Sequence, residues 1–225
     1  MKLHCHPLST TSRCVLFFVH DAGIKVDEVT VDLFTGEHVK EPFTNLNPSK
    51  MVPVLDDDGF ILTESSAILK YLAEKAGSAA YPAGDIKTRA KINELMDWIN
   101  VNLYRDFGYG LVYPQVFPNH KRPSVDLQKG TLDWAKERCE SWLEILDQKL
   151  LGPKRNHLVG DKLTIADYFG LGILTSGELV GCGFKNYPNV KRWLDGMKQR
   201  PGYAKVFGPF NDLTASLKGK EFAAV

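Results

Sequence analysis

The sequence predicts two domains of different class, an α/β domain at the N-terminus and an all-α helical bundle at the C-terminus. Over roughly the first 76 residues, short apolar strands alternate with helical segments, whereas beyond residue 86 apolar residues recur only at helix spacing. A stretch containing glycine and proline separates the two patterns. We therefore place the first domain at residues 1–78, a linker at residues 79–85 and the helical domain at residues 86–225.

The first half of the N-terminal domain is predicted to run strand, helix, strand, short helix. Lys2 to Pro7 is expected to be a strand, and Ser12 to Ala22 a helix that Gly23 ends. Lys25 to Asp32 alternates in polarity, which indicates a second strand. A loop and a short helix follow over residues 36–46.

The second half of this domain turns around Pro53. Val52 must be extended, because a residue before proline is pushed out of the α region. The turn signal at residues 56–59 leads into a short apolar strand, Phe60–Leu62, and residues 63–66 are of the kind that start a helix. The order β-α-β-α-β-β-α is the thioredoxin-like pattern, in which helices cover a mixed sheet.

The C-terminal domain shows helical periodicity and no convincing strand. Thr164 and Asp167 form a capping box, which predicts the start of a helix. Within residues 103–118, two glycines and Pro114 are expected to interrupt the helix. Apolar residues at the spacing typical of a helical bundle are Ile92, Met96, Ile99 and Leu103, and then Leu132, Ala135, Cys139, Trp142, Leu143, Leu146 and Leu150.

Composition excludes several classes of protein. A hydrophobic content of 44% and a charged content of 24% are ordinary for a globular protein. The net charge of +1 gives no indication of nucleic-acid or membrane-surface binding. No run of about 18 apolar residues predicts a membrane span, and the N-terminus lacks the pattern of a signal peptide. The expected location is therefore cytoplasmic.

The cysteines predict neither a disulfide framework nor a metal site. Cys5, Cys14, Cys139 and Cys182 contain no C-x-x-C pair, so reduced and mostly buried thiols are expected. His4, Cys5 and His6 are adjacent in sequence, but on a strand the histidines face one way and the cysteine the other. We therefore expect no metal.

Two features of the N-terminal domain suggest a ligand. The strand edge at Val52 is predicted to lie beside a helix N-terminus at Ser65, so a peptide could pair with the edge and place its carboxylate on the helix N–H groups. Ser9 falls between the first strand and the first helix, where its hydroxyl could cap the helix or donate into a cleft. Thr10, Thr11 and Ser12 carry competing hydroxyls.

These features belong to a set of motifs whose order and spacing resemble the glutathione transferases. The resemblance covers essentially the whole chain and is closest to the theta and delta classes, which have an active-site serine. It implies a detoxifying transferase that uses glutathione as co-substrate against small apolar electrophiles. The matching motifs are Leu8-Ser9, Val31–His38, Asn47-Pro48, Val52-Pro53, Phe60–Leu69 and Leu158–Asp167.

The resemblance assigns Ser9 as the group that holds glutathione as a thiolate. A free thiol titrates near ~8.5, and lowering that pKa by about two units requires roughly 2.7 kcal/mol. One hydrogen bond to a charged group supplies roughly 1.5–3 kcal/mol, and a helix N-terminus adds roughly 0.3–1 kcal/mol. A hydroxyl at a helix end is therefore sufficient. A serine in place of cysteine also argues against a disulfide reductase.

The resemblance further implies a glutathione site made of His38, Lys50, Met51, Val52, Pro53, Glu64 and Ser65. Ser65 would hold the γ-glutamyl carboxylate, and Glu64 would face the neighbouring ammonium. The main chain of Val52 would pair with the cysteinyl residue, beside a cis Pro53.

His38 and Lys50 would reach the glycine carboxylate of glutathione, although either could equally be a solvated surface group. Met51 departs from the family, because some theta-class members have lysine there, which makes the role of Lys50 less secure.

The electrophile pocket is expected between the domains. An aromatic segment interrupted by glycine and proline suits an apolar pocket, although core or dimer packing explains it equally well. Phe207 and Phe210 are expected to close the pocket as a lid. The candidate pocket residues are Leu8, Tyr104, Phe107, Tyr113 and Phe117.

The resemblance also implies a homodimer with each glutathione site near the interface. Three other functions stay open, and one of them, a glutathione-dependent disulfide reductase, is disfavoured by Ser9. Transferase-like domains also act as non-catalytic scaffolds or carriers, because fold does not settle function, and glutathione-dependent dehalogenation is a reaction variant in the family. The presence of Ser9, Glu64 and Ser65 favours the enzyme.

Overall fold

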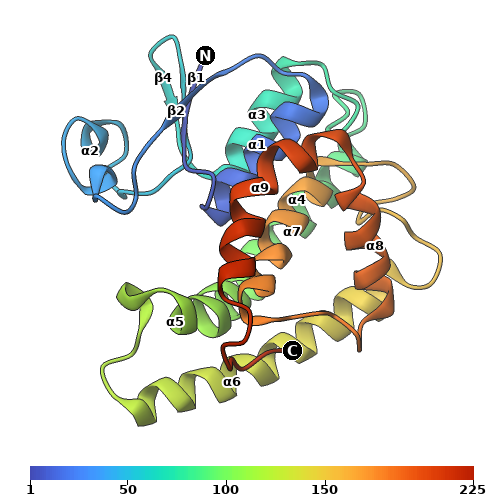
Figure 1. The fold of residues 1–225 in the computed structure, drawn as a ribbon. Coiled ribbons are helices and arrows are strands. Elements are labelled where there is room, and N and C mark those ends of the chain that lie inside the picture. The colour runs from blue at the N-terminus through green and yellow to red at the C-terminus, as the bar shows by residue number, and fades with distance from the viewer.

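The computed structural model describes residues 1–225 and shows an α/β unit packed against a larger group of helices (Figure 1). The predicted order of elements in the N-terminal unit is confirmed. In chain order the elements are β1 (Lys2–Cys5), α1 (Thr10–Ala22), β2 (Asp27–Thr30), a 3₁₀ helix (Glu37–Val39), α2 (Phe43–Leu46), β3 (Val54–Asp57), β4 (Phe60–Leu62) and α3 (Ser65–Lys75).

The four strands form one mixed sheet in the order β2-β1-β3-β4. β1 runs parallel to β2 and antiparallel to β3, and β3 and β4 form an antiparallel hairpin. Leu3 on β1 is paired with Leu55 on β3. Both side chains are fully buried, which places the main core on that face of the sheet.

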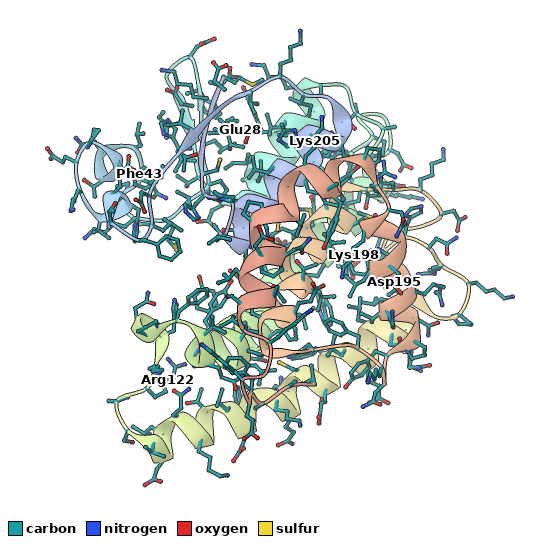
Figure 2. The ribbon with its side chains drawn as sticks, in the orientation of Figure 1. Glu28, Phe43, Arg122, Asp195, Lys198 and Lys205 are labelled. Atoms are coloured by element: carbon teal, nitrogen blue, oxygen red, sulfur yellow. The ribbon has the colours of Figure 1, made fainter.

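Helices cover both faces of the sheet. Residues of α1 and α3 join Leu3 and Leu55 in the main core, whereas Phe43 of α2 joins Val31, Val52 and Val54 in a small second cluster. Figure 1 shows α2 on the opposite side of the strands from α1 and α3, and Figure 2 labels Phe43 there. The segment at Val52, just before β3, is thus supported from one side by α2.

The C-terminal unit is helical throughout, as predicted. Its elements are α4 (Ile86–Trp98), a π-helix (Ile99–Val112), α5 (Tyr113–Val116), a 3₁₀ helix (Pro118–His120), α6 (Val125–Glu144), a second π-helix (Ile145–Leu151), α7 (Ile165–Thr175), a 3₁₀ helix (Ser176–Val180), α8 (Pro188–Lys198) and α9 (Pro201–Ser216). No helix is long and apolar enough to cross a membrane.

The predicted interruption of the helix by glycine and Pro114 is wrong. Residues 86–116 are helical without a break, with a wide π-helical stretch in the middle. Gly108 lies under the ring of Tyr104, and Gly110 lies against Ala135, at distances that leave no room for a Cβ atom. These glycines permit close packing, and Pro114 is tolerated near the start of α5.

The two units share one core. α1 packs on α7 so closely that a Cβ atom on Gly172 would lie 2.3 Å from Cys14 Sγ. The predicted capping box at the start of α7 is present. The Asp167 carboxylate accepts hydrogen bonds from the Thr164 N–H at 2.8 Å, the Leu158 N–H at 2.8 Å and the Trp193 indole at 2.9 Å. This buried carboxylate therefore ties the loop before α7 to α8.

Candidate active site

A cavity of about 310 Å³ opens between the sheet end of the N-terminal unit and the long helix of the C-terminal unit. One wall comes from α1, the loop before β3 and the start of α3, and the other comes from the π-helical stretch. The lining residues are Thr11, Asn47, Met51, Val52, Pro53, Glu64, Ser65, Asn100, Tyr104, Arg105 and Tyr109.

Ser9 is the N-cap of α1. Its backbone is extended, with φ −70° and ψ 124°, and its Oγ accepts a hydrogen bond from the Ser12 N–H at 3.3 Å. The side chain is half-buried and does not line the cavity. Ser9 therefore performs the capping role, and its Oγ lies 3.3 Å from the Thr11 Oγ1, which does line the cavity.

The other hydroxyls of this turn point elsewhere. Ser12 is fully buried, and its Oγ accepts from the His6 N–H at 3.3 Å. Thr10 is also buried and does not line the cavity. Thr11 donates to the Val52 carbonyl at 3.0 Å. Of the three competitors of Ser9, only Thr11 faces the cavity.

Val52 lies just outside the sheet. The ladder with β1 begins at Val54, which pairs with His4, so the main chain of Val52 extends beyond the last paired residue. The Val52–Pro53 peptide bond is cis, as the resemblance implied. Asn47 braces this loop by donating from Nδ2 to the Met51 carbonyl at 2.8 Å.

The N-terminus of α3 is open towards the cavity. Its N-cap residue, Glu64, makes no side-chain capping bond, and the first turn contains no acidic residue. The first N–H groups of a helix have no partner within the helix, and the helix dipole favours an anion beside them. Both Glu64 and the buried Ser65 line the cavity, so this end of the 11-residue helix is available to a carboxylate.

Of the three remaining residues that were predicted to bind glutathione, one lines the cavity and two do not. Met51 lines the cavity and is half exposed. Lys50 is exposed and His38 is half-buried on the 3₁₀ helix, and neither lines the cavity. The buried Nδ1 of His38 nevertheless has no hydrogen-bond partner.

The helical wall of the cavity is aromatic and polar. Tyr104 lines it and shares a hydrogen bond of 2.7 Å with the Tyr113 hydroxyl. Burial raises the pKa of Tyr113 to about 12 and that of Tyr104 well above its ordinary value, so both phenols are protonated at neutral pH. Asn100, Arg105 and Tyr109 complete this wall.

Four predicted pocket residues do not reach the cavity. Phe107 was predicted wrongly, because its side chain is fully buried on the other side of the helix, against Phe184 and Gly177. Leu8, Tyr113 and Phe117 also do not line it. The ring of Phe117 packs on Tyr113, which in turn contacts Tyr104, so both lie behind the wall.

Phe207 and Phe210 do not form a lid. Both are fully buried in the core on α9, where the Arg13 guanidinium lies 3.8 Å from the Phe210 ring centroid. Arg13 donates to the Leu8 carbonyl at 2.8 Å, and its Nε and Nη2 have no partner. Burial lowers the pKa of Arg13 to about 10, so it is still a cation at neutral pH, one turn from Ser9.

Sequence reasoning missed Asn47, Asn100, Arg105 and Tyr109. The last three follow a visible pattern, because Asn100 and Tyr104, and Arg105 and Tyr109, are each four residues apart on one helix face. Asn47 carried no comparable signal beyond its place in the Asn47-Pro48 motif. All four cysteines are free and buried, and none lies at the cavity.

Comparison with known families gives a match for each unit. Residues 1–74 match the family described as glutathione S-transferase, N-terminal domain, and residues 118–201 match glutathione S-transferase, C-terminal domain.

Individual proteins agree with these matches. Glutathione S-transferase theta-2 of Rattus norvegicus is 34% identical over 202 residues, which covers 87% of this chain and 79% of that protein. The apo form of human glutathione-S-transferase T1-1 superimposes with a TM-score of 0.80, at 27% identity over 99% of this chain and 92% of that one. A Nilaparvata lugens delta-class glutathione transferase gives a TM-score of 0.77 and 30% identity, over 96% and 99% of the two chains.

Proposed function

Given that this chain belongs to the glutathione S-transferase family and is a glutathione transferase, we propose that the cavity between the two units binds glutathione and activates it as a thiolate. The observation that carries this proposal is the convergence of three groups on one cavity. These are the unpaired strand end at Val52, the open N-terminus of α3 and the hydroxyl-rich N-terminus of α1.

Each part of glutathione has a complementary group. The γ-glutamyl carboxylate would accept hydrogen bonds from the Ser65 N–H and hydroxyl, and Glu64 would pair with the adjacent ammonium. The cysteinyl main chain would pair with Val52 as an added strand. Pro53 and Met51 would form the wall beside it, and His38 and Lys50 would reach the glycine carboxylate as the ligand extends beyond the cavity.

Ser9 is the proposed activating serine. Its position at the N-cap of α1 combines a hydroxyl with the positive end of a helix dipole. The thiol proton would leave to solvent, because a thiolate with a lowered pKa needs no protein base at neutral pH. The buried charge of Arg13, which has no carboxylate partner, adds positive potential on the same side of α1.

The electrophile would enter against the helical wall. Tyr104 and Tyr109 offer aromatic faces to an apolar substrate, and Leu8, Tyr113 and Phe117 would support that wall from behind. The thiolate then displaces a leaving group such as halide or adds to an activated double bond, with orientation in the cavity providing much of the acceleration.

The test is a titration of the bound glutathione thiol by its ultraviolet thiolate absorbance, in the wild type and in Ser9→Ala. We expect a bound pKa about two units below that of the free thiol, and a return towards the free value in the variant. Below the bound pKa the thiolate becomes protonated, so kcat/KM falls with acid, and this limb should move to higher pH in Ser9→Ala. Glutathione that binds without a lowered pKa would favour a scaffold or carrier.

A homodimer is the proposed assembly. Phe60 on β4, Met51 at the cavity and Val101 on the long helix are large apolar side chains that are about half exposed or more, and a second copy of the chain would bury them. Because Met51 also lines the cavity, an interface over it would lie beside the glutathione site. We expect light scattering to give the mass of two chains for the wild type and of one chain for Phe60→Glu. A wild-type mass of one chain would contradict the dimer.

A further inference from the structure

The turn that carries Ser9 is organised by a single histidine. Residues 6–9 connect β1 to α1. Within this turn, the Ser9 N–H donates to the His6 carbonyl at 3.0 Å, and the Leu8 N–H donates to the Nδ1 atom of the His6 ring at 3.2 Å. Two successive main-chain N–H groups, including that of Ser9, therefore have their acceptors on His6.

His6 is itself held in place on several sides. It is buried, with 8% of its surface exposed, and its main-chain N–H donates to the Ser12 Oγ at 3.3 Å. Its ring packs edge-on against Phe34, with 5.5 Å between the ring centroids. The Leu8 carbonyl is fixed as well, because it accepts from Arg13 at 2.8 Å. These contacts keep the Nδ1 atom of His6 opposite the Leu8 N–H.

The hydrogen bond at Nδ1 requires one protonation state of His6. An imidazole nitrogen that accepts a hydrogen bond carries no proton, so the ring is neutral and its proton lies on Nε2. Burial lowers the pKa of His6, against the opposing effect of the Asp32 carboxylate, and this favours the neutral form. With a proton on Nδ1, the ring could not accept from Leu8.

The position of the turn matters because it directs the Ser9 hydroxyl. Ser9 Oγ accepts from the Ser12 N–H at 3.3 Å, which leaves its own proton free to donate to an acceptor. Hydrogen bonds weaken steeply when their angle falls below about 120°, and misplacement of a reacting group by about 1 Å can cost about a hundredfold in rate. A residue that fixes the main chain of Ser9 therefore influences the reaction without contacting the ligand.

We propose that His6 is a positioning residue for Ser9, and that its neutral imidazole holds the turn so that the Ser9 hydroxyl points at the glutathione sulfur. This inference rests on the proposed function and deepens it. Ser9 makes the direct contact with the sulfur. His6 acts through the main chain of Leu8 and Ser9, and the thiol proton still leaves to solvent.

The experiment measures the thiol pKa of bound glutathione in the wild type, His6→Leu and His6→Asn. Leucine and asparagine have nearly the same shape, but only the asparagine oxygen can accept from the N–H two residues further on. We expect His6→Leu to raise the bound pKa by about 0.5 to 1 unit, a part of the one to two units that loss of a whole hydrogen bond to a charged group would give. His6→Asn should keep the low pKa.

Two further measurements separate positioning from a general structural role. If His6 acts through Ser9, His6→Leu should produce no additional shift of the bound thiol pKa in a Ser9→Ala background. Nitrogen NMR of the wild type should show the His6 ring with an unprotonated Nδ1 and a protonated Nε2. The NMR measurement needs no variant, so it tests the proposal even where a substituted chain does not fold.

His4→Leu is the matched control. His4 lies on β1 two residues before His6 and is half-buried, with its ring edge-on to Phe43 at 6.5 Å between centroids. The control measures the effect of removing a neighbouring imidazole that is not part of the turn. It should leave the bound thiol pKa unchanged.

Four results would overturn this role for His6. The first is a low pKa retained in His6→Leu. The second is an equal rise in His6→Leu and His6→Asn, which would indicate packing as the cause. The third is a shift that persists in the Ser9→Ala background, which would make the effect independent of Ser9. The fourth is a proton on Nδ1 in the NMR spectrum. Absence of any lowered pKa in the wild type would instead contradict the proposed function itself.

Discussion

Glu64 has a backbone conformation that glutamate rarely adopts. Its φ of 66° and ψ of 111° lie on the positive-φ side, where a Cβ atom costs roughly 1–2 kcal/mol. It connects β4 to α3 at the edge of the cavity, and its side chain makes no capping bond that would compensate. Strain of this kind persists where the surrounding structure imposes it and often accompanies binding sites.

This strain predicts a difference between two substitutions that remove the same side-chain charge. Glu64→Gly relieves the strain of the positive φ, whereas Glu64→Ala keeps a Cβ atom and with it the strain. Glycine also adds entropy to the unfolded chain, which opposes this gain. We therefore expect the glycine variant to be as stable as the alanine variant or up to about 1 kcal/mol more stable. Both should weaken glutathione binding by about tenfold through loss of the ammonium partner. Chemical denaturation and calorimetric titration measure the two effects. Unchanged affinity in both variants would remove Glu64 from the site.

In the long helix over residues 86–116, the sequence shows that a segment is aromatic but not which of its side chains face the cavity. The aromatic residues were visible in sequence, and Tyr104 does line the cavity. Phe107, three residues later, faces the core. A straight 3.6-residue helix and a wider π-helix rotate successive side chains by different angles. The π-helical stretch packs closely on α6, where Gly110 meets Ala135, and this contact joins residues that are far apart in the sequence.

The two units share one core, so their relative position is set by contacts between them and not by either unit alone. The cavity is bounded by α1 and α3 on one side and by the long helix on the other, so its width depends on how α1 docks on α7. That contact is as close as backbone allows, because the missing side chain of Gly172 leaves room for Cys14. Interiors packed at this density transmit small displacements.

Gly172→Ala should therefore disturb both stability and the cavity. A methyl group 2.3 Å from Cys14 Sγ must displace α7 from α1, and overpacking of this kind costs roughly 1–3 kcal/mol. Adding Cys14→Ala removes the sulfur and should recover part of the loss, although Cys14 Cα and N, both at 3.2 Å, still limit the fit.

Gly196→Ala on α8 is the control, because no atom lies within 4 Å of its added Cβ. It should be neutral or stabilising by up to about 1 kcal/mol. Thermal unfolding and the KM for glutathione are measured for these three variants and the wild type. Equal stability of Gly172→Ala and Gly196→Ala would show that the two units are not held by this contact.

The sequence by itself determined the features that depend on neighbours along the chain. The end of α1 at Gly23, the capping box at Asp167 and the order of strands and helices all follow from local stereochemistry and periodicity. The tertiary structure alone decided which side chains meet at the cavity. Thr11 rather than Ser9 faces it, and Phe210 lies against Arg13 rather than over the site, because these outcomes depend on helix rotation and docking between segments far apart in sequence.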